Sequence, residues 1–408
     1  MRRVVVTGLG VFSPLGNDIR AVWDAVTGAR SGIAPLKRFT WDEPRVYPVG
    51  EVHDFDPTAH FTSGDLELLD RFSQLAVVAA RAAAADAGLE LRNDEMDRAG
   101  VAVGSAYGGA ETYEATYRRL YGERVPRVHP MTIPRLMHNA AASQISKALQ
   151  ARGPCLSIST ACASAAQAIG EAYRAITAGT ADVMLAGGSD APLTPGILKS
   201  WEAMRVLASG SDDLAQACRP FSADRDGIVL AEGAAILVLE ESARARRRGA
   251  HIYAEFAGYG ASSDGGHVTQ PSVEGPARAM ELALRDAGAA PDDVDYVNAH
   301  GTATRLNDVV ETRAIRQVFR DAARVPAVSS TKSMHGHLMG ASGALELLIT
   351  VLALHHGVLP PTAHYRGRDP ECDLDYVPNE ARPQRIRLAL PNSFAFGGIN
   401  AVLAVRTL

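Results

Sequence analysis

Asp86-Ala87-Gly88 closes an alanine-rich helical pattern, and the same three residues return as Asp286-Ala287-Gly288 at the end of a second one. After each copy an acidic linker leads into a short apolar run typical of a buried strand, at residues 101–104 and 294–298. Both units then continue through another strand, a turn with a reactive side chain and a further helix. Repetition of such a long pattern indicates an internal duplication.

Both copies end in apolar strands that begin at a glycine, Gly233 in the first copy and Gly398 in the second. Strands that alternate with helices predict an α/β fold with mixed, mostly parallel sheets and helices between them. We place the boundary near residues 249–251, which gives two halves at 1–250 and 251–408. Two irregular stretches are long for a compact core and are expected to be insertions that cap the first half: residues 41–63 and 111–134.

Composition is that of a large intracellular protein. Of 408 residues, 47% are hydrophobic and 21% are charged, which is enough to bury a sizeable core. The 41 basic residues are outnumbered by 46 acidic ones, so bulk charge does not favour a nucleic-acid partner. The chain has neither a signal-peptide pattern nor an apolar stretch that approaches a membrane span. Four cysteines without paired spacing predict reduced thiols in the cytoplasm: Cys155, Cys162, Cys218 and Cys372.

Cys162 lies in Thr160-Ala161-Cys162-Ala163-Ser164, between two segments of different pattern. Residues 155–159 are expected to form a short buried strand, and residues 163–178 a helix that ends at Gly179. At the start of a helix the backbone N–H groups are unpaired and the dipole is positive, which favours a thiolate and can hold an oxyanion. Most buried cysteines only fill space, so the interpretation as a nucleophile depends on the rest of the chain.

Two histidines occupy similar places later in the chain. His300 follows the apolar run 294–297 in Asn298-Ala299-His300-Gly301-Thr302, and His337 lies between a predicted strand at 327–330 and a helix that begins near Ala341. All three reactive groups thus stand at the C-terminal ends of strands, where α/β sheets place their sites.

Other motif interpretations are weaker. His335 and His337 would suit zinc on paper, but no third ligand has suitable spacing, and no HExxH or CxxC pattern occurs. Gly8-Leu9-Gly10 follows a valine strand, yet Ser13 stands where a dinucleotide-binding loop has its third glycine. We therefore expect neither a metal centre nor a nicotinamide cofactor.

Four motifs, around Cys162, His300, His337 and Phe396, give the chain a resemblance that covers almost its whole length. It resembles β-ketoacyl-[acyl carrier protein] synthases of the synthase II type, in the thiolase-like superfamily that also includes polyketide ketosynthases. The resemblance implies a five-layer αβαβα thiolase-like fold made of two duplicated halves. It also implies a decarboxylative Claisen condensation of a cysteine-bound acyl group with malonyl-[acyl carrier protein], which yields 3-oxoacyl-[acyl carrier protein]. No cofactor is expected, because phosphopantetheine arrives on the carrier protein.

Carried over to this chain, the resemblance makes Cys162 the nucleophile and places the oxyanion hole at the N–H groups of Cys162 and Phe396. Phe396 would also be the gating residue. His300 and His337 would stabilise the enolate, with Lys332 as a further essential catalytic group. The remaining roles implied are support by Glu346 and Asp308, substrate binding by Thr302, Thr304, Tyr107, Trp201 and Phe394, carrier docking by Arg205, and a monovalent cation near Asn298, Glu346 and Asn392.

Three departures from the family pattern bear on the pathway. The segment 62–71 is acidic where fatty-acid enzymes carry basic docking residues, Tyr107 replaces an aliphatic tunnel residue, and Ala395 replaces a glycine of the gating loop. They favour a ketosynthase of a type II polyketide system, a polyene system included, that acts as a homodimer or with a chain-length-factor-like subunit. The alternative is 3-oxoacyl-ACP synthase II of fatty-acid elongation. An inactive partner subunit would usually lack Cys162, and a thiolase would carry a second cysteine near Phe396.

Overall fold

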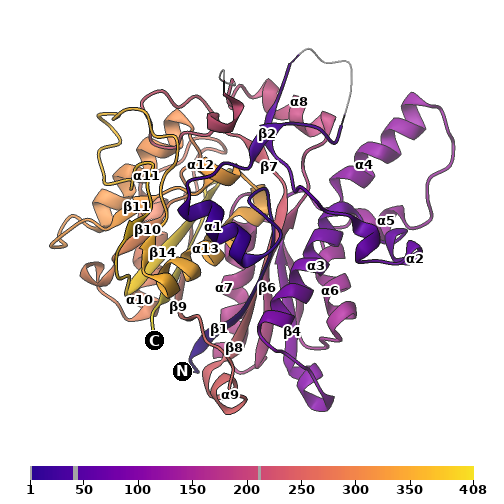
Figure 1. The fold of residues 1–408 in the computed structure, drawn as a ribbon, viewed down its shortest axis with the longest axis horizontal. Coiled ribbons are helices and arrows are strands. Elements are labelled where there is room, and N and C mark those ends of the chain that lie inside the picture. The colour runs from indigo at the N-terminus through magenta and orange to yellow at the C-terminus, as the bar shows by residue number, and fades with distance from the viewer. Residues whose placement is uncertain (1, 40–44, 210–212) are drawn as a thin grey trace.

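The computed structural model describes residues 2–39, 45–209 and 213–408, and its centre is a ten-stranded mixed sheet (Figure 1). The strand order is β11-β10-β14-β15-β9-β1-β8-β6-β4-β5. Five neighbouring strands come from the first part of the chain: β1 (Val4–Phe12), β4 (Ala99–Gly104), β5 (Cys155–Ile158), β6 (Val183–Asp190) and β8 (Gly233–Glu241). The other five come from the second part: β9 (Ala254–Ser263), β10 (Tyr296–Asn298), β11 (Ala327–Ser329), β14 (Leu388–Ala395) and β15 (Ile399–Arg406).

The two groups of strands have the same order when each is counted from the middle of the sheet, as a duplication requires. They meet only where β1 pairs with β9, through Val4 opposite Phe256, Val5 opposite Glu255 and Val6 opposite Ala254. The halves behave as two five-stranded sheets that share a short seam. The domain boundary near residue 250 stays a prediction, although the linker from β8 to β9 spans it.

Helices fill the space between the two sheets and cover their outer faces. α7 (Ser164–Thr177) and α13 (Ser342–His356) pack against each other and against strands of both halves. α3 (Arg71–Asp86) and α6 (Ala140–Leu149) cover the first sheet, and α10 (Glu274–Ala287) covers the second with α11 (Arg305–Val318) beside it (Figure 1). The five-layer αβαβα architecture that the resemblance implies is confirmed.

The Gly-x-Gly pattern of β1 exists for packing. A Cβ at Gly10 would lie 2.0 Å from the carbonyl oxygen of Ala79, and one at Gly8 would lie 2.2 Å from that of Ala83. Gly260 of β9 repeats this arrangement against α10, where its Cβ would lie 2.1 Å from the Ala279 oxygen. The glycines therefore let the outer helix of each half touch the backbone of the innermost strand.

The repeated aspartate has the same structural role in both halves. Asp86 Oδ2 accepts a hydrogen bond from the backbone N–H of Leu9 at 2.9 Å, and Asp286 Oδ2 accepts one from Tyr259 at 2.9 Å. Each carboxylate thus joins the C-terminal end of an outer helix to the middle residue of the Gly-x-Gly pattern in the innermost strand. The Asp-Ala-Gly repeat is thus a helix-to-strand contact that was duplicated with the fold.

The smaller elements connect these layers. They are α1 (Ile19–Thr27), β2 (Ile33–Pro35), β3 (Pro48–Gly50), α2 (Ser63–Leu66), α4 (Ala110–Tyr117), α5 (Thr132–Leu136), α8 (Pro195–Ala203), β7 (Leu230–Ala231), α9 (Ser242–Arg247), α12 (Lys332–His335), β12 (Val358–Leu359) and β13 (Arg382–Pro383), with short 3-10 turns and one π-helical turn (Arg118–Gly122) between them.

Three expectations from the sequence are corrected. Neither long stretch is irregular throughout: 111–134 includes most of α4, a π-helical turn (Arg118–Gly122) and the start of α5, and 41–63 includes β3, a 3-10 turn (Pro57–Ala59) and the first residue of α2, with residues 41–44 outside the described chain. β5 is an exposed edge strand, not a buried one, with Leu156 41% exposed. The segment Met339–His356 is long and apolar enough to span a membrane, with a mean hydropathy of 1.3, yet 89% of it is buried because it contains the central helix α13.

The glycine contacts make a testable prediction. Gly10→Ala should lower the free energy of unfolding by about 1–3 kcal/mol or more, because its Cβ has no room against α3. Gly266→Ala is the matched control, since its Cβ would meet nothing within 4 Å. Urea unfolding of both variants measures the difference, and equal stabilities would contradict the packing explanation.

Candidate active site

Cys162 lies in a tight turn between the edge strand β5 and the N-terminus of α7. Ala161 has a φ of +50°, an uncommon conformation for a residue with a side chain. Ser164 holds the turn, because its Oγ accepts a hydrogen bond from Thr160 N–H at 2.9 Å and donates one to the Ala161 oxygen at 2.6 Å. The turn presents the buried thiol at the positive end of a central helix.

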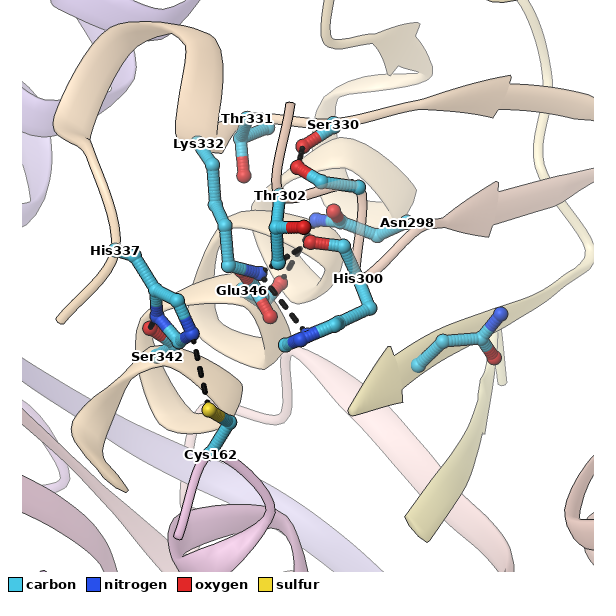
Figure 2. Close-up of polar contacts among 12 residues, drawn as sticks. Cys162, Asn298, His300, Thr302, Ser330, Thr331, Lys332, His337, Ser342 and Glu346 are labelled. Carbon is cyan, nitrogen blue, oxygen red and sulfur yellow. Dashed lines mark hydrogen bonds and ion pairs between the residues drawn. The ribbon is translucent and has the colours of Figure 1, made fainter. Parts of the chain in front are cut away.

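The structure brings Cys162, His300 and His337 together from three distant parts of the chain (Figure 2). Their sulfur and nitrogen atoms lie within 4.8 Å of one another. His337 Nε2 is 3.1 Å from Cys162 Sγ, and the two imidazole rings are 5.4 Å apart at an angle of 83°. All three side chains are buried. The cluster predicted from strand ends is therefore a compact site with one sulfur and two imidazoles.

Fixed donors determine which nitrogen of each imidazole carries the proton. The backbone N–H of Met339 donates to His337 Nδ1 at 3.1 Å, and the Ser342 hydroxyl lies 2.7 Å from the same atom. The Lys332 ammonium lies 3.4 Å from His300 Nδ1. Because both Nδ1 atoms face donors, the neutral rings hold their hydrogens on Nε2. Two N–H groups consequently become available beside the sulfur.

Both rings are held in the neutral form. Burial lowers the pKa of His300 well below its ordinary value, and the charge of Lys332 lowers it further. Burial and Lys332 act on His337 in the same direction. A metal at the Nε2 atoms would have to displace these hydrogens while Nδ1 still faces a donor, so the trio is poorly suited to a metal ion.

His335 does not form a zinc pair with His337. Its Nδ1 lies 2.7 Å from the oxygen of Gly336 and its Nε2 lies 3.1 Å from the hydroxyl of Thr331, so both ring nitrogens are engaged away from the trio. The side chain is completely buried. His335 therefore supports the backbone of this loop, and this role replaces the alternative in which it binds a metal with His337.

Lys332 is a buried member of the site, which the sequence left undecided against an exposed loop position. Its ammonium pairs with the Glu346 carboxylate and donates to the backbone oxygen of His300 at 2.6 Å. Both charged side chains are 0% exposed. Burial raises the pKa of Glu346 to about 7, while the Lys332 charge opposes that rise. Through these two contacts the pair connects α12, α13 and the loop that carries His300 (Figure 2).

Two further carboxylates hold the His300 loop from behind. Asp308, expected from the resemblance, accepts from Thr302 N–H at 3.2 Å and from Phe221 N–H at 2.8 Å. Glu311 was missed: it accepts from the N–H groups of His300 and Gly301, both at 2.8 Å. No pattern in the sequence marks it, because an acid inside a helical pattern does not show which backbone N–H groups it will meet. Burial raises the pKa of both carboxyls, that of Asp308 to about 6.

The structure contradicts the thiolate expected at Cys162 from the helix N-terminus. Burial raises the pKa of the thiol to about 12, although the charge of Lys332 and the thiol's own backbone N–H lower it. The neutral thiol is therefore the resting form. The helix N-terminus and the His337 N–H stabilise the negative sulfur when it forms during reaction.

A pocket of about 440 Å³ leads from the surface to the trio. Thr302 and Thr304 line it, and their hydroxyls lie 2.9 Å apart. Trp201 and Phe396 also line it and stack with a centroid distance of 5.7 Å, and Phe394 lies edge-on to His300. The lining contains one cysteine among the residues described, Cys162. The expected substrate-binding side chains thus gather along one channel.

Tyr107 does not line this channel and instead packs against the apolar cluster that contains Cys162 and Trp201. Its hydroxyl accepts a hydrogen bond from Trp201 Nε1 at 2.7 Å. Burial raises the pKa of the phenol, which stays protonated. Tyr107 and Trp201 together form an aromatic wall in the cluster that contains Cys162, and Trp201 joins this wall to the channel.

The predicted carrier-docking features are only partly as expected. Arg205 is exposed directly after α8, and its neighbours Met204 and Val206 line the pocket, so it lies at the mouth. The acidic segment 62–71 is less of a surface than expected, because Asp70 is 1% exposed and accepts two hydrogen bonds from Thr112. The expected effect of acidic residues on carrier docking is therefore limited to the exposed part of that segment.

The three residues expected to hold a cation each carry a buried oxygen without a hydrogen-bond partner among the residues described: Asn298 Oδ1, Glu346 Oε2 and Asn392 Oδ1. Such atoms are costly to bury unless something satisfies them. Oxygens of this kind, one of them from a carboxylate, suit a cation that prefers oxygen ligands. The donor set fits the expected monovalent cation, and these three residues would hold it.

Comparison with known proteins agrees with this geometry. The chain matches the models for the Beta-ketoacyl synthase N-terminal domain at residues 1–245 and C-terminal domain at residues 253–366. It is 44% identical to 3-oxoacyl-[acyl-carrier-protein] synthase 2 of Staphylococcus aureus (strain N315), over 99% of this chain and 98% of that protein. It is 47% identical to Nodulation protein E of Rhizobium sp. (strain N33), with 99% of each covered.

Among solved structures, the ishigamide ketosynthase/chain length factor matches with a TM-score of 0.93 and 36% identity, covering 100% of this chain and 99% of that one. The chain therefore belongs to the β-ketoacyl synthase family. It is an acyl-transferring ketosynthase.

The imidazole arrangement makes a prediction for nuclear magnetic resonance. In protein with ¹⁵N-labelled histidine, His300 and His337 should show the neutral Nε2–H form and should keep it when the pH falls through 6.5, because burial and Lys332 lower both pKa values. Spectra of His300→Asn and His337→Asn assign the signals. Titration of either ring near pH 6.5 would contradict the assignment.

Proposed function

We propose that this enzyme condenses a Cys162-bound acyl group with malonyl-[acyl carrier protein] to give 3-oxoacyl-[acyl carrier protein], in type II polyketide biosynthesis. The observation that carries the reaction is the pair of neutral Nε2–H donors beside the Cys162 sulfur. Developing negative charge on a thioester oxygen needs such donors, placed in advance in a dry site. A base that removes a proton from carbon is not required when carbon dioxide leaves.

In the first half-reaction Cys162 sulfur attacks the acyl thioester. The carbon–sulfur bond to the carrier breaks, and the carrier thiol departs with the proton lost by Cys162. The N–H groups of Cys162 and Phe396 hold the oxyanion in this proposal. Phe396 lines the pocket next to Trp201, which suits a side chain that must move when an acyl chain enters.

In the second half-reaction the malonyl thioester loses carbon dioxide, and the electron pair of the broken bond forms an enolate. His300 and His337 donate to the enolate oxygen. The enolate carbon then attacks the acyl carbonyl, the bond to Cys162 breaks, and the thiolate takes up a proton. Lys332 supports this step by holding His300 in its donor form and Glu346 in the buried pair. Thr302 and Thr304 hold the pantetheine arm.

The polyketide assignment is supported by Tyr107 and by the match to a ketosynthase/chain length factor structure. Fatty-acid elongation is the second candidate, and the 44% identity to 3-oxoacyl-[acyl-carrier-protein] synthase 2 favours it. Intact-mass analysis of carrier-bound products, with the acyl group offered on a fatty-acid carrier and on a pathway-specific carrier, distinguishes the two. Preference for the pathway-specific carrier supports the polyketide role, and equal rates favour elongation.

We further propose a cytoplasmic enzyme that needs no cofactor of its own, with acyl carrier protein docking at Arg205. The second subunit is another copy or a chain-length-factor-like chain. The unpaired edge of β5 and the exposed Ile133 and Leu156 support an interface there. Neither nucleic acid nor membrane is a partner in this proposal. Size measurement of the protein alone and with a candidate partner subunit tests the assembly.

The division of labour predicts a split between half-reactions. His300→Ala and His337→Ala should still acquire an acyl group on Cys162, while condensation falls by about two to three orders of magnitude per donor lost. Mass spectrometry of the acyl-enzyme and a product assay measure the two steps. Cys162→Ala controls for acylation elsewhere, and loss of acylation in both folded histidine variants would refute the proposed roles.

The aromatic wall predicts a change in acyl selectivity. Tyr107→Ile should raise the relative use of long saturated acyl groups by about fivefold, because it removes one ring and its hydroxyl from the aromatic wall. Tyr107→Phe keeps the ring and removes only the hydroxyl that accepts from Trp201, so its effect should be smaller. Competition between acyl donors measures both, and an unchanged product profile in Tyr107→Ile would contradict the wall.

A further inference from the structure

Asp190 is a fully buried carboxylate at the end of β6. Its Oδ1 accepts hydrogen bonds from the Ser105 hydroxyl at 2.7 Å and from Tyr107 N–H at 3.1 Å. Its Oδ2 accepts from Ala106 N–H at 2.9 Å and from Gly340 N–H at 2.7 Å. All four donors are uncharged, and three of them belong to the backbone. One carboxylate thus satisfies donors from two loops that are far apart in the sequence.

These two loops carry different parts of the site. Ser105 to Tyr107 follow β4 and place the tyrosine ring of the aromatic wall. Gly340 lies between His337 and Ser342, whose hydroxyl contacts His337 Nδ1. A Cβ at Gly340 would lie 2.5 Å from Ala106 N and 2.6 Å from Asp190 Oδ2, so only glycine lets the loops meet at the carboxylate.

We propose that Asp190 is a positioning residue that couples the acyl-pocket wall at Tyr107 to the loop that holds His337. The proposal rests on the proposed condensation reaction and assigns Asp190 no contact with substrate. A carboxylate is the side chain suited to this place, because its two oxygens accept four hydrogen bonds without donating any. Burial raises the pKa of Asp190 to about 6 while the four donors lower it, so the group is ionised at neutral pH.

Asparagine at position 190 has the right shape and the wrong hydrogen-bonding character. Its NH₂ group would face Ala106 N–H and Gly340 N–H in one orientation and Tyr107 N–H in the other. In either orientation at least one backbone donor is left facing another donor, which costs a hydrogen bond and pushes the loop away. The carboxylate cannot be replaced without moving Tyr107 or the His337 loop.

Asp190→Asn should therefore lower the condensation rate by about tenfold or more and change the preference among acyl chain lengths by about threefold or more. Ser105→Ala removes one donor and keeps the carboxylate, so it should change the preference in the same direction by less. The matched control is Glu240→Gln, which loses a carboxylate equally buried at the opposite end of the same pair of strands. It should lower stability without changing the acyl preference.

A second measurement separates positioning from general loosening. The charge of Asp190 is one of the causes that raise the pKa of the Cys162 thiol, so Asp190→Asn should shift the pH profile of iodoacetamide alkylation at Cys162 to lower pH. Ser105→Ala keeps the charge and should not shift it. The other charged or titratable groups that face the thiol keep their identity in both variants: Lys332, Glu346, His300, His337 and Tyr107.

Each outcome has a distinct meaning. If the wild-type enzyme does not condense, the proposed function fails independently of Asp190. If the wild-type enzyme condenses and Asp190→Asn matches it in rate, acyl preference and alkylation profile, the positioning role is overturned. If Asp190→Asn does not fold, Ser105→Ala carries the test, and an acyl preference identical to wild type and to Glu240→Gln overturns the proposal.

Discussion

The close packing of α7 against α13 is the contact on which the site depends. A Cβ at Gly343 would lie 3.1 Å from the Cβ of Ala166, so the two central helices touch through a glycine and an alanine near their N-termini. Cys162 precedes the first helix and His337 precedes the second. Their contact therefore brings the sulfur and one imidazole together, with two positive helix ends pointing at the place where negative charge develops.

This packing buries charged side chains. Burying a charge is energetically unfavourable, so nearby groups pair with each charge or form hydrogen bonds to it. Among the described residues, Lys332 is the cation that contacts the trio, at His300, and the Glu346 carboxylate neutralises it. The acids behind the loops are satisfied mainly by backbone N–H groups: Glu311 by His300 and Gly301, and Asp308 in part by Thr302. Each of these hydrogen bonds stabilises a carboxylate and at the same time fixes the backbone of a loop that carries chemistry.

Much of the fold was predictable, because the duplication leaves a repeated pattern in the sequence. Part of the site was predictable as well, because reactive residues stand at the ends of predicted strands. Cys162, His300 and His337 were identified for that reason. Glu311 and Asp190 were not, since an acid in a helical pattern or at a strand end gives no sign in the sequence of the backbone N–H groups it will meet. The expectation of a thiolate at Cys162 was wrong for a related reason. The helix N-terminus can be predicted from the local sequence, whereas the burial that raises the pKa of Cys162 depends on tertiary packing.

The duplicated halves also explain why chemistry and selectivity lie side by side. β4 and β10 hold equivalent places in the two sheets, and the loop after each reaches the same centre. In the second half that loop carries His300, a hydrogen-bond donor. In the first half it carries Tyr107, a wall residue bound to Trp201. Equivalent loops of the two halves thus place His300 and Tyr107 in the surroundings of the same sulfur, that of Cys162.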